Sequence, residues 1–352
     1  MICVMRDELY VIEGFFNGGI EISLYNLLKQ YDYGVNRVTV LSMVGGPLLQ
    51  KFKELPITII CLCEEEKAFR GKHRLVNLSI KYLPPRFLHF LYLRGMNFDT
   101  EIAYHNGQPA VIVSGAPSKT KKVAWFHMGF PLEATVNNID NYLSSGEKAI
   151  NCYECFDELV CVSHGQRKTL LKLFEMAGAD FSSKISVRHN IIDYDRIERL
   201  SQEKCEIYNP GILIVACGRL SVEKGFDRIV EMARYLVAVK DDFCILIIGG
   251  GEEQNRLREM VRDYGINDYV KFLGFQENPY KFFKKADYVI CPSRYESFGL
   301  VVAEALALGK CVIASKCEGT VELLMGVQNS YLIENDDTHF PEQAARIIIS
   351  GK

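Results

Sequence analysis

Two cationic side chains stand in one short loop of the chain's second half, Cys217-Gly-Arg-Leu-Ser-Val-Glu-Lys-Gly225. The loop follows a strand-like apolar run and leads into a helical pattern that starts at Phe226. Arg219 offers a planar fork of hydrogen-bond donors, and Lys224 offers a compact positive charge. Backbone amides at the start of a helix also attract anions. This combination suits a diphosphate group, although an ordinary solvated loop could hold the same two cations.

Two carboxylates occupy the next informative stretch, which runs from Ser293 to Gly309. Glu296 precedes a predicted helix and Glu304 lies within it, and the helix is otherwise apolar. We expect Ser297 to be the N-cap and Gly309 to end the helix. A carboxylate in so apolar a helix is costly if it is buried without a partner. Both acids can bind hydroxyl groups of one ligand whose phosphate lies at the helix N-terminus. The alternative is one acid at a helix start and one structurally paired helix acid.

A glycine-rich turn stands between a strand-like run and a helical pattern in the first half, Glu13-Gly-Phe-Phe-Asn-Gly-Gly19. Gly18 and Gly19 would let the backbone approach an anionic ligand closely, but a plain tight turn explains them too. The chain contains no GxGxxG sequence, so the turn is not a dinucleotide-binding fingerprint.

A single histidine, His127, follows Trp125 and Phe126 at the end of another strand-like run. An imidazole at the carboxyl end of a parallel strand can reach a bound substrate. It can equally cap the strand or pack against its neighbours, so its role is open on this pattern alone.

These side chains must be positioned by a series of short apolar runs that alternate with helical patterns. Such alternation predicts right-handed βαβ units in doubly wound parallel sheets. Twelve or more parallel strands are too many for one sheet, so we expect two six-stranded sheets. The predicted strands cover residues 9–12, 37–41, 57–60, 101–104, 123–126, 159–162, 185–187, 212–215, 244–248, 270–273, 288–290 and 311–314.

The chain of 352 residues therefore divides into two predicted Rossmann-like domains. The break should fall in the polar stretch from Asp193 to Gly211, which ends in an Asn-Pro-Gly turn cluster. We place the boundary between an N-terminal domain, residues 1–195, and a C-terminal domain, residues 196–352.

One segment departs from the average composition. Residues 67–98 contain seven Lys or Arg and no Asp or Glu, interleaved with leucines and aromatic residues. A basic, aromatic-rich amphipathic segment can lie on an anionic membrane surface. The alternative is two helices, split by Pro84 and Pro85, that pack on the first sheet with a solvated basic face.

Composition excludes several other classes. The formal charge is −3, from 41 Lys or Arg against 44 Asp or Glu, so the chain lacks the basic field of a nucleic-acid-binding protein. The first residues show no basic and apolar signal peptide, which predicts a cytoplasmic protein. Contact of residues 67–98 with a membrane would place it peripherally on the inner membrane face. Cys152 and Cys155 form a single CxxC, with no second CxxC to complete a zinc site.

The combined motifs resemble those of retaining GT-B glycosyltransferases, in the glycogen-synthase-like and bacterial polysaccharide-assembly branch known as glycosyltransferase family 4. The resemblance rests on Gly18-Gly-Ile-Glu21, Trp125-Phe-His127, Gly218-Arg219 with Glu223-Lys-Gly225, Gly249-Gly-Gly251, and Glu296 with Phe298-Gly-Leu-Val-Val-Ala-Glu304. It covers nearly the whole chain, and it implies the GT-B fold, with two doubly wound domains and a cleft between them.

The resemblance also implies a role for each matching position. Arg219 and Lys224 would hold the donor diphosphate, and Glu304 would bind the ribose hydroxyls. Glu296 would contact the donor sugar. The remaining implied contacts are Gly18 and Gly19 with the phosphate, His127 with the sugar, Gly274 and Phe275 with the base, and the amides of Phe298, Gly299 and Leu300 with sugar and phosphate.

The activity that the resemblance implies is transfer of a hexosyl group from a nucleotide-sugar, expected to be a UDP-sugar, to a hydroxyl of a glycan or lipid-linked glycan. Capsule, exopolysaccharide or lipopolysaccharide synthesis is the expected setting. No cofactor and no metal are expected, and Asp193-Tyr-Asp195 is interpreted as part of the hinge and not as a metal-binding DxD motif. Two alternatives remain: a nucleotide-sugar 2-epimerase of the same fold, and a catalytically silent partner subunit.

Overall fold

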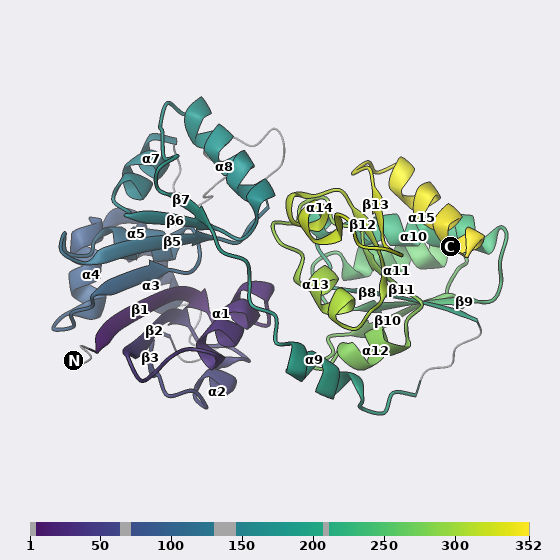
Figure 1. Ribbon diagram of the computed structural model, residues 1–352, viewed down its shortest axis with the longest axis horizontal. Coiled ribbons are helices and arrows are strands. Elements are labelled where there is room, and N and C mark those ends of the chain that lie inside the picture. Colours follow the sequence, from purple (N-terminus) through teal and green to yellow (C-terminus); the bar gives the residue numbers. More distant parts are fainter. Residues whose placement is uncertain (1–4, 64–71, 130–145, 207–210, 352) are drawn as a thin grey trace. The chain divides into compact units, whose positions relative to one another are not determined.

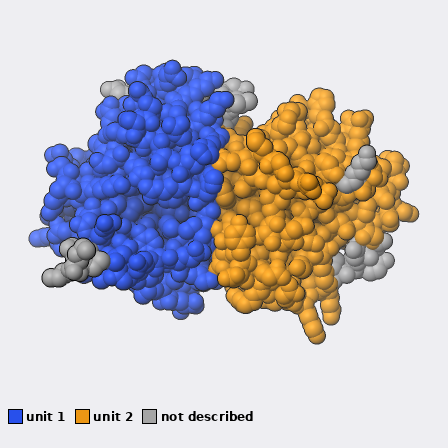
Figure 2. Space-filling model, in the orientation of Figure 1, with its two compact units in different colours: residues 1–191 blue, residues 192–352 orange. Residues whose placement is uncertain are grey.

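The computed structural model describes residues 5–63, 72–129, 146–206 and 211–351. The chain forms two compact units, residues 1–191 and 192–352 (Figures 1 and 2). The predicted boundary after residue 195 falls inside a helix, Tyr194–Ser201, whose Ile197 is buried in the core of the second unit.

Unit 1 contains a parallel sheet of seven strands in the order β3-β2-β1-β4-β5-β6-β7. The strands are β1 (Arg6–Gly14), β2 (Asn36–Val44), β3 (Thr58–Cys61), β4 (Thr100–Ala103), β5 (Lys121–Phe126), β6 (Glu158–Cys161) and β7 (Ile185–Val187). The helices are α1 (Gly19–Lys29), α2 (Leu49–Phe52), α3 (Lys72–Tyr82), α4 (Pro85–Leu93), α5 (Gln108–Ser114), α7 (Gly146–Glu154) and α8 (His164–Met176).

Unit 2 contains a parallel sheet of six strands in the order β10-β9-β8-β11-β12-β13. The strands are β8 (Ile212–Cys217), β9 (Phe243–Ile248), β10 (Val270–Gly274), β11 (Tyr288–Cys291), β12 (Cys311–Ser315) and β13 (Tyr331–Ile333). The helices are α9 (Tyr194–Ser201), the single 3₁₀ turn η2 (Val222–Lys224), α10 (Phe226–Val237), α11 (Gln254–Asp263), α12 (Tyr280–Lys285), α13 (Leu300–Ala307), α14 (Glu318–Leu324) and α15 (His339–Ser350).

Both faces of the second sheet are covered, as the doubly wound prediction requires (Figure 1). Because successive strand residues point to opposite faces, β8 contributes to two separate cores. Ile214 and Ala216 pack with helices α10, α11 and α15, whereas Leu213 and Val215 pack with α9, α12 and α13. A strand that is buried on both faces has a continuous apolar sequence, so such strands could be predicted from the sequence.

In unit 1 the same alternation appears along β1. Leu9 and Val11 belong to a core that also contains side chains of α3, α4, α5, α7 and α8. On the other face, the ring of Tyr10 lies 6.1 Å from that of Tyr104, whose hydroxyl is 2.9 Å from the Ser23 hydroxyl of α1. The predicted α/β fold of two doubly wound parallel sheets is therefore confirmed.

Three details of the fold prediction were wrong. The first sheet has seven strands and not six, and β13 was missed, because three residues between polar neighbours give no clear apolar run. The N-cap of α13 is Gly299 and not Ser297, so the helix begins two residues later than predicted. Gly299 has a left-handed backbone at φ 93°, which turns the chain into the helix. Gly309, at φ 66°, does end this helix as predicted.

Candidate functional site

The strand order of unit 2 brings the two predicted donor loops together. β8 and β11 are neighbours at the centre of the sheet, and the chain leaves them in opposite directions to reach β9 and β12. Ligands of open parallel sheets bind at the carboxyl ends of strands at such a reversal. The loop after β8 carries Arg219 and Lys224, and the loop after β11 carries Glu296.

Glycines allow these loops to approach each other. A Cβ on Gly225 would lie 2.3 Å from the Pro292 carbonyl oxygen, and Gly225 has φ 65°. A Cβ on Gly249 would lie 1.9 Å from the carbonyl oxygen of Gly218, and one on Gly251 would lie 2.3 Å from that of Leu220. Any side chain at these positions would push the cationic loop out of place. The three-glycine motif at 249–251 therefore supports the loop that carries Arg219.

Lys224 and Glu296 form the central contact of the site, since Lys224 Nζ donates to Glu296 Oε2 over 2.7 Å. The two side chains are 30% and 15% exposed. Burial lowers the pKa of Lys224, but the Glu296 carboxylate, together with Cys291 and Glu223, raises it by more, so the net pKa lies above the ordinary value. The lysine is therefore charged at neutral pH, and its charge is balanced by the carboxylate predicted to contact the sugar.

Arg219 is exposed at the tip of the same loop. Its guanidinium makes no ion pair with another residue in the described part of the chain. An exposed fork of donors beside a paired lysine provides positive charge that an incoming diphosphate can bind.

Glu304 lies on α13 and accepts a hydrogen bond from the Tyr280 hydroxyl of α12 over 2.9 Å. Burial raises the pKa of Glu304 to about 7, against the opposing effects of Tyr280 and of the Arg196 guanidinium. Arg196 Nη1 also donates to the Tyr280 hydroxyl over 3.4 Å. The ionised form of this carboxyl can accept hydrogen bonds from hydroxyl groups of a ligand. The hydrogen bond from Tyr280 holds Oε1 of Glu304 in place.

The other predicted donor contacts of unit 2 lie at loop ends. Phe298 is buried, Gly299 is the N-cap of α13, and Leu300 begins that helix, whose first amides have no partner within the helix. Gly274 ends β10 at φ 67°, and the Phe275 side chain that follows is 59% exposed. An exposed aromatic ring at the carboxyl end of a strand can stack on a base.

Unit 1 holds the remaining predicted residues. Gly18 is the N-cap of α1 and Gly19 its first residue. A Cβ on Gly18 would lie 2.4 Å from Glu21 Oε2, so the glycine makes room for a carboxylate of its own helix. Glu21 is buried, and its Oε1 lies 3.5 Å from His105 Nε2. The Glu21 carboxylate and a ligand phosphate would thus compete for the positive end of α1.

His127 follows β5 and is buried against aromatic rings. It stacks on Trp125 at 5.6 Å between ring centroids, and it lies 4.6 Å from the ring of Tyr104. Burial lowers the pKa of His127 well below the ordinary value, and His105 lowers it further. The imidazole is therefore neutral at neutral pH, which suits positioning of a hydroxyl group and not attraction of an anion.

The sequence analysis missed Tyr280 and His105, and it quoted Glu21 only as part of a motif, with no role. His105 is 7% exposed, and its Nδ1 has no hydrogen-bond partner among the described residues. Its strand, β4, lies between β1 and β5, so the loops that carry Gly18, His105 and His127 leave neighbouring strands. The position of His105 at the end of a predicted strand was a usable signal, whereas nothing in the sequence linked Tyr280 to Glu304.

Asp193 is the N-cap of α9, because its carboxylate accepts from the Arg196 amide over 3.0 Å. This accounts for the first acid of the DxD sequence without a metal. The second acid, Asp195, lies in the first turn of the same helix, where a negative charge is favourable.

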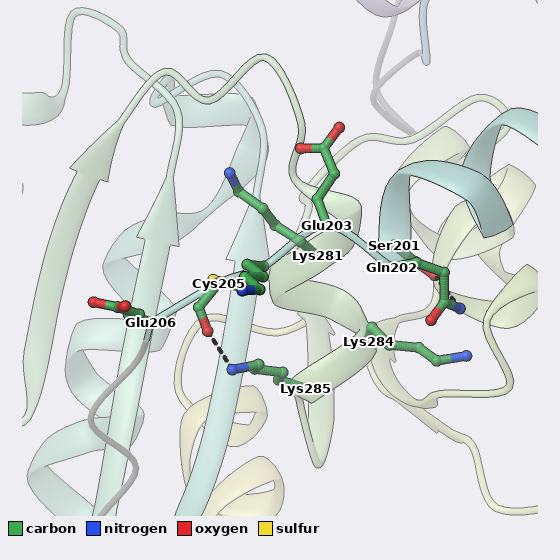
Figure 3. A pocket seen from close by; sticks show the side chains of 9 residues that line it. Ser201, Gln202, Glu203, Cys205, Glu206, Lys281, Lys284 and Lys285 are labelled. Atoms are coloured by element: carbon green, nitrogen blue, oxygen red, sulfur yellow. Dashed lines mark hydrogen bonds between the residues drawn. The ribbon is translucent and has the colours of Figure 1, made fainter.

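A separate open depression of about 380 Å³ lies beside α9 and α12 (Figure 3). Its lining includes several lysines, of which Lys285 donates to the Cys205 carbonyl and Lys284 lies 3.5 Å from Glu198. None of the predicted donor-binding residues lines it.

Known glycosyltransferases are similar to this chain in sequence. The chain is 26% identical over 181 residues to an uncharacterized glycosyltransferase of Methanocaldococcus jannaschii, covering 50% of this chain and 45% of that protein. It is 25% identical over 279 residues, 78% of this chain and 74% of the relative, to the N-acetylgalactosamine-N,N'-diacetylbacillosaminyl-diphospho-undecaprenol 4-alpha-N-acetylgalactosaminyltransferase of Campylobacter jejuni. With the first curated relatives the match spans about half of their length.

The fold matches solved structures along its whole length. The crystal structure of Anabaena HepE in complex with UDP has a TM-score of 0.71 and 19% identity, covering 99% of this chain and 91% of that one. Residues 198–350 match the family described as glycosyl transferases group 1, and this range contains both cationic and both acidic residues of the site. This family match lies within the second unit, residues 192–352.

Proposed function

We propose that this protein transfers a sugar from a UDP-sugar to a hydroxyl group of a glycan or lipid-linked glycan, with retention of the anomeric configuration. The observation that carries the proposal is the Lys224–Glu296 pair, 2.7 Å apart where the loops after β8 and β11 meet. A diphosphate and a sugar ring attached to it offer the matching groups, since the phosphate binds the cation and a sugar hydroxyl donates to the carboxylate.

The names of relatives and solved structures support this choice of donor and acceptor. Solved structures of Anabaena HepE contain UDP and UDP-glucose, and the name of the Campylobacter jejuni relative specifies a diphospho-undecaprenol acceptor. Other relatives act in lipopolysaccharide core and O-antigen biosynthesis. These likenesses favour a UDP-sugar donor and a lipid-linked acceptor for this chain, in the synthesis of a surface polysaccharide.

In the proposed reaction the sugar passes from the diphosphate to the acceptor hydroxyl. The bond between the sugar's anomeric carbon and the diphosphate breaks, a bond to the acceptor oxygen forms, and the acceptor proton passes to the departing phosphate. Lys224 and Arg219 stabilise the negative charge that develops on the diphosphate, and Glu296 and neutral His127 position the sugar. Catalysis is then mainly positioning and electrostatic stabilisation.

A panel of UDP-, GDP- and ADP-sugars tests the donor assignment, because a bound ligand raises the melting temperature of the folded protein. We expect UDP-sugars to stabilise the full chain, and sugar to appear on a lipid-linked acceptor when one is added. Conversion of the donor without an acceptor would indicate an epimerase. A chain that binds no nucleotide-sugar in calorimetry would be a silent partner, and the proposal would be wrong.

Sugar transfer is expected to continue in the presence of a chelator. Arg219 and Lys224 supply the positive charge at the diphosphate, so the proposed site needs no divalent ion there. The measurement compares transfer rates with and without excess EDTA, and with magnesium restored afterwards. Loss of transfer in EDTA that magnesium restores would contradict metal independence.

We also propose that the surface formed by α3 and α4 contacts an anionic membrane, which would bring the enzyme to a lipid-linked acceptor. The predicted segment 67–98 is described from residue 72 onward, and residues 67–71 lie outside the described part. Within the described residues, no helix is both long and apolar enough to pass through a bilayer. Membrane contact through this surface would therefore be peripheral.

Each helix packs on the sheet with one face and exposes apolar side chains on the other. Val76 and Ile80 of α3 and Leu88 of α4 are buried in the core of unit 1. The exposed side chains follow helical spacing on both helices, namely Leu75, Leu78 and Tyr82 on α3, and Phe87, Phe90 and Leu91 on α4. These exposed apolar side chains on one pair of helices support the proposed contact surface.

Basic groups accompany these apolar side chains. Lys81 Nζ lies 5.5 Å from the centre of the Tyr82 ring, and the Arg94 guanidinium lies 5.5 Å from the Phe90 ring. Arg86, in the first turn of α4, is also exposed. Positive charge beside exposed aromatic rings matches the headgroup region of an anionic bilayer, where each basic residue contributes about 1 kcal/mol.

We expect the protein to sediment with vesicles of phosphatidylcholine and phosphatidylglycerol, and far less with pure phosphatidylcholine. The double variant Phe87→Ser, Phe90→Ser should bind the anionic vesicles about tenfold more weakly, because two aromatic side chains no longer enter the interface. Met176→Ser is the matched control, since Met176 is 68% exposed on α8 of the same unit. Equal binding of all three proteins to the anionic vesicles would refute the membrane surface.

A further inference from the structure

We propose that Arg294 is a positioning residue that sets the spacing between the Lys224 loop and the Glu296 loop, and so the grip on the donor. The inference rests on the proposed function, because it concerns the same site. Arg294 stands in the loop after β11, two residues before Glu296, and its own side chain points to the other loop, where its partners lie.

The Arg294 guanidinium binds the neighbouring loop and helix with its whole fork of donors. Nη1 and Nη2 donate to the two carboxylate oxygens of Asp227, over 3.0 and 2.8 Å. Nη1 also donates to the Val222 carbonyl over 2.7 Å. Asp227 lies in the first turn of α10 and Val222 begins η2, so Arg294 holds the chain on both sides of Lys224. A two-point pair of this kind fixes orientation as well as distance.

The backbone makes the same connection. The Arg294 amide donates to the Glu223 carbonyl over 2.8 Å, directly before Lys224 in the sequence. Gly225, directly after Lys224, has no room for a side chain beside the Pro292 carbonyl. The two loops therefore contact each other through the residues directly before and directly after Lys224.

A second arginine, Arg228, binds the beginning of the loop after β11. Arg228 of α10 is 3% exposed and donates to the Pro292 carbonyl over 3.0 Å. Arg228 Nε and Arg294 Nε both donate to Asp337 Oδ1, over 2.7 and 3.0 Å. Asn335 completes the connection, since its amide donates to the Arg294 carbonyl over 2.8 Å.

The two arginines have different roles in the loop after β11. Arg228 is buried and holds the base of the loop, so its loss should disturb folding. Arg294 is 18% exposed and holds the far side of the loop against η2. Without Arg294 the fold retains the Arg228 contacts, but Lys224 and Glu296 lose the clamp that aligns them. A misplacement of about 1 Å at such a site can cost roughly a hundredfold in rate.

The test replaces Arg294 with glutamine and, separately, with lysine, in the full chain, and measures UDP-sugar turnover and UDP binding by calorimetry. We expect Arg294→Gln to raise the KM for the donor and to lower kcat, each by about tenfold. Arg294→Lys keeps the charge but loses the two-point geometry, so it should not restore either constant. A role in stability alone would lower the melting temperature and leave KM and kcat unchanged in the folded protein.

Arg256→Gln is the matched control. Arg256 of α11 also contacts Asp227, at 3.5 Å, but it binds neither the Val222 carbonyl nor the Asp337 carboxylate that Arg294 holds. This variant should keep wild-type KM and kcat.

Three outcomes separate the claims. Wild-type constants in a folded Arg294→Gln protein would overturn the inference and leave the proposed function intact. A wild-type chain that neither binds nor turns over any nucleotide-sugar would instead overturn the proposed function. If Arg294→Gln does not fold, Asp227→Asn decides, since it weakens the two-point pair while Arg294 keeps its other contacts: a raised KM supports the clamp, and an unchanged KM overturns it.

Discussion

Replacing Lys224 with alanine is expected to lower the rate of sugar transfer by up to about a hundredfold, because a charge-assisted contact with the diphosphate contributes roughly 1.5 to 3 kcal/mol. Arg219→Ala should have an effect of the same kind. The loss should appear in kcat/KM for the donor, measured with saturating acceptor. Lys316→Ala is the control, because Lys316 is an exposed lysine of the same unit that pairs with Glu334. A Lys224→Ala enzyme with full activity would show that the diphosphate assignment is wrong.

The Lys224–Glu296 pair complicates this experiment, and a second variant resolves it. Removal of Lys224 also leaves the Glu296 carboxylate, only 15% exposed, without its cation, and such a group costs stability. Glu296→Gln removes the carboxylate charge and leaves Lys224 fully available to a diphosphate. We therefore expect this variant to bind free UDP at least as well as the wild type and to transfer sugar much more slowly. If it binds UDP more weakly, Glu296 does not hold the lysine back from the diphosphate.

Donor affinity is expected to rise with pH because of Glu304. Ribose hydroxyls donate to a carboxylate, and burial raises the pKa of Glu304 to about 7, so the form that binds the ribose gains population as pH rises through 7. Between pH 6 and pH 8 the affinity should increase about tenfold, following the ionised fraction. UDP-glucose is the suitable probe, because the terminal phosphate of UDP itself titrates near pH 6.

Glu304→Gln isolates this effect. The amide does not titrate, so donor affinity should lose its rise between pH 6 and pH 8 and stay at or below the lowest wild-type value. Calorimetric titrations at both pH values measure it, and binding of ribose-free uracil diphosphate analogues provides the comparison. A variant that keeps the wild-type pH dependence would assign the titration to another group.

The same pKa shift has a consequence for stability without a ligand. The native protein binds the Glu304 proton more tightly than the unfolded chain, whose carboxyl titrates near 4.5. The resulting stabilisation is fully present below pH 4.5 and is lost as pH rises through 7, by up to about 3 kcal/mol. The free energy of unfolding, measured with urea at several pH values, should therefore change less with pH for Glu304→Gln than for the wild type.

The sequence predicted most of the strands and the loops of unit 2 that carry Arg219, Lys224 and Glu296. All twelve predicted apolar runs are strands, because strands buried on both faces leave an unbroken apolar signal. The short β13 left no such signal, and the entry into α13 depended on the left-handed conformation of Gly299. Backbone conformation at a single glycine is decided by the contacts around it, which local patterns do not contain.

The partners within the site were beyond the reach of sequence patterns. Lys224 and Glu296 are 72 residues apart, and Tyr280 and Glu304 are 24 apart. Each pair meets only because of the order in which the strands join the sheet. The same reason explains why the contact between Glu21 and His105 was not predicted: the two residues are far apart in the sequence and lie 3.5 Å from each other because β1 and β4 are neighbours in the sheet.

A crystal structure of the full chain with UDP would show directly whether the two cations bind the diphosphate. We expect the diphosphate to lie within hydrogen-bond distance of Lys224 Nζ and the Arg219 guanidinium, with the ribose hydroxyls donating to Glu304. UDP bound elsewhere on the protein, or bound with its diphosphate away from both cations, would contradict it.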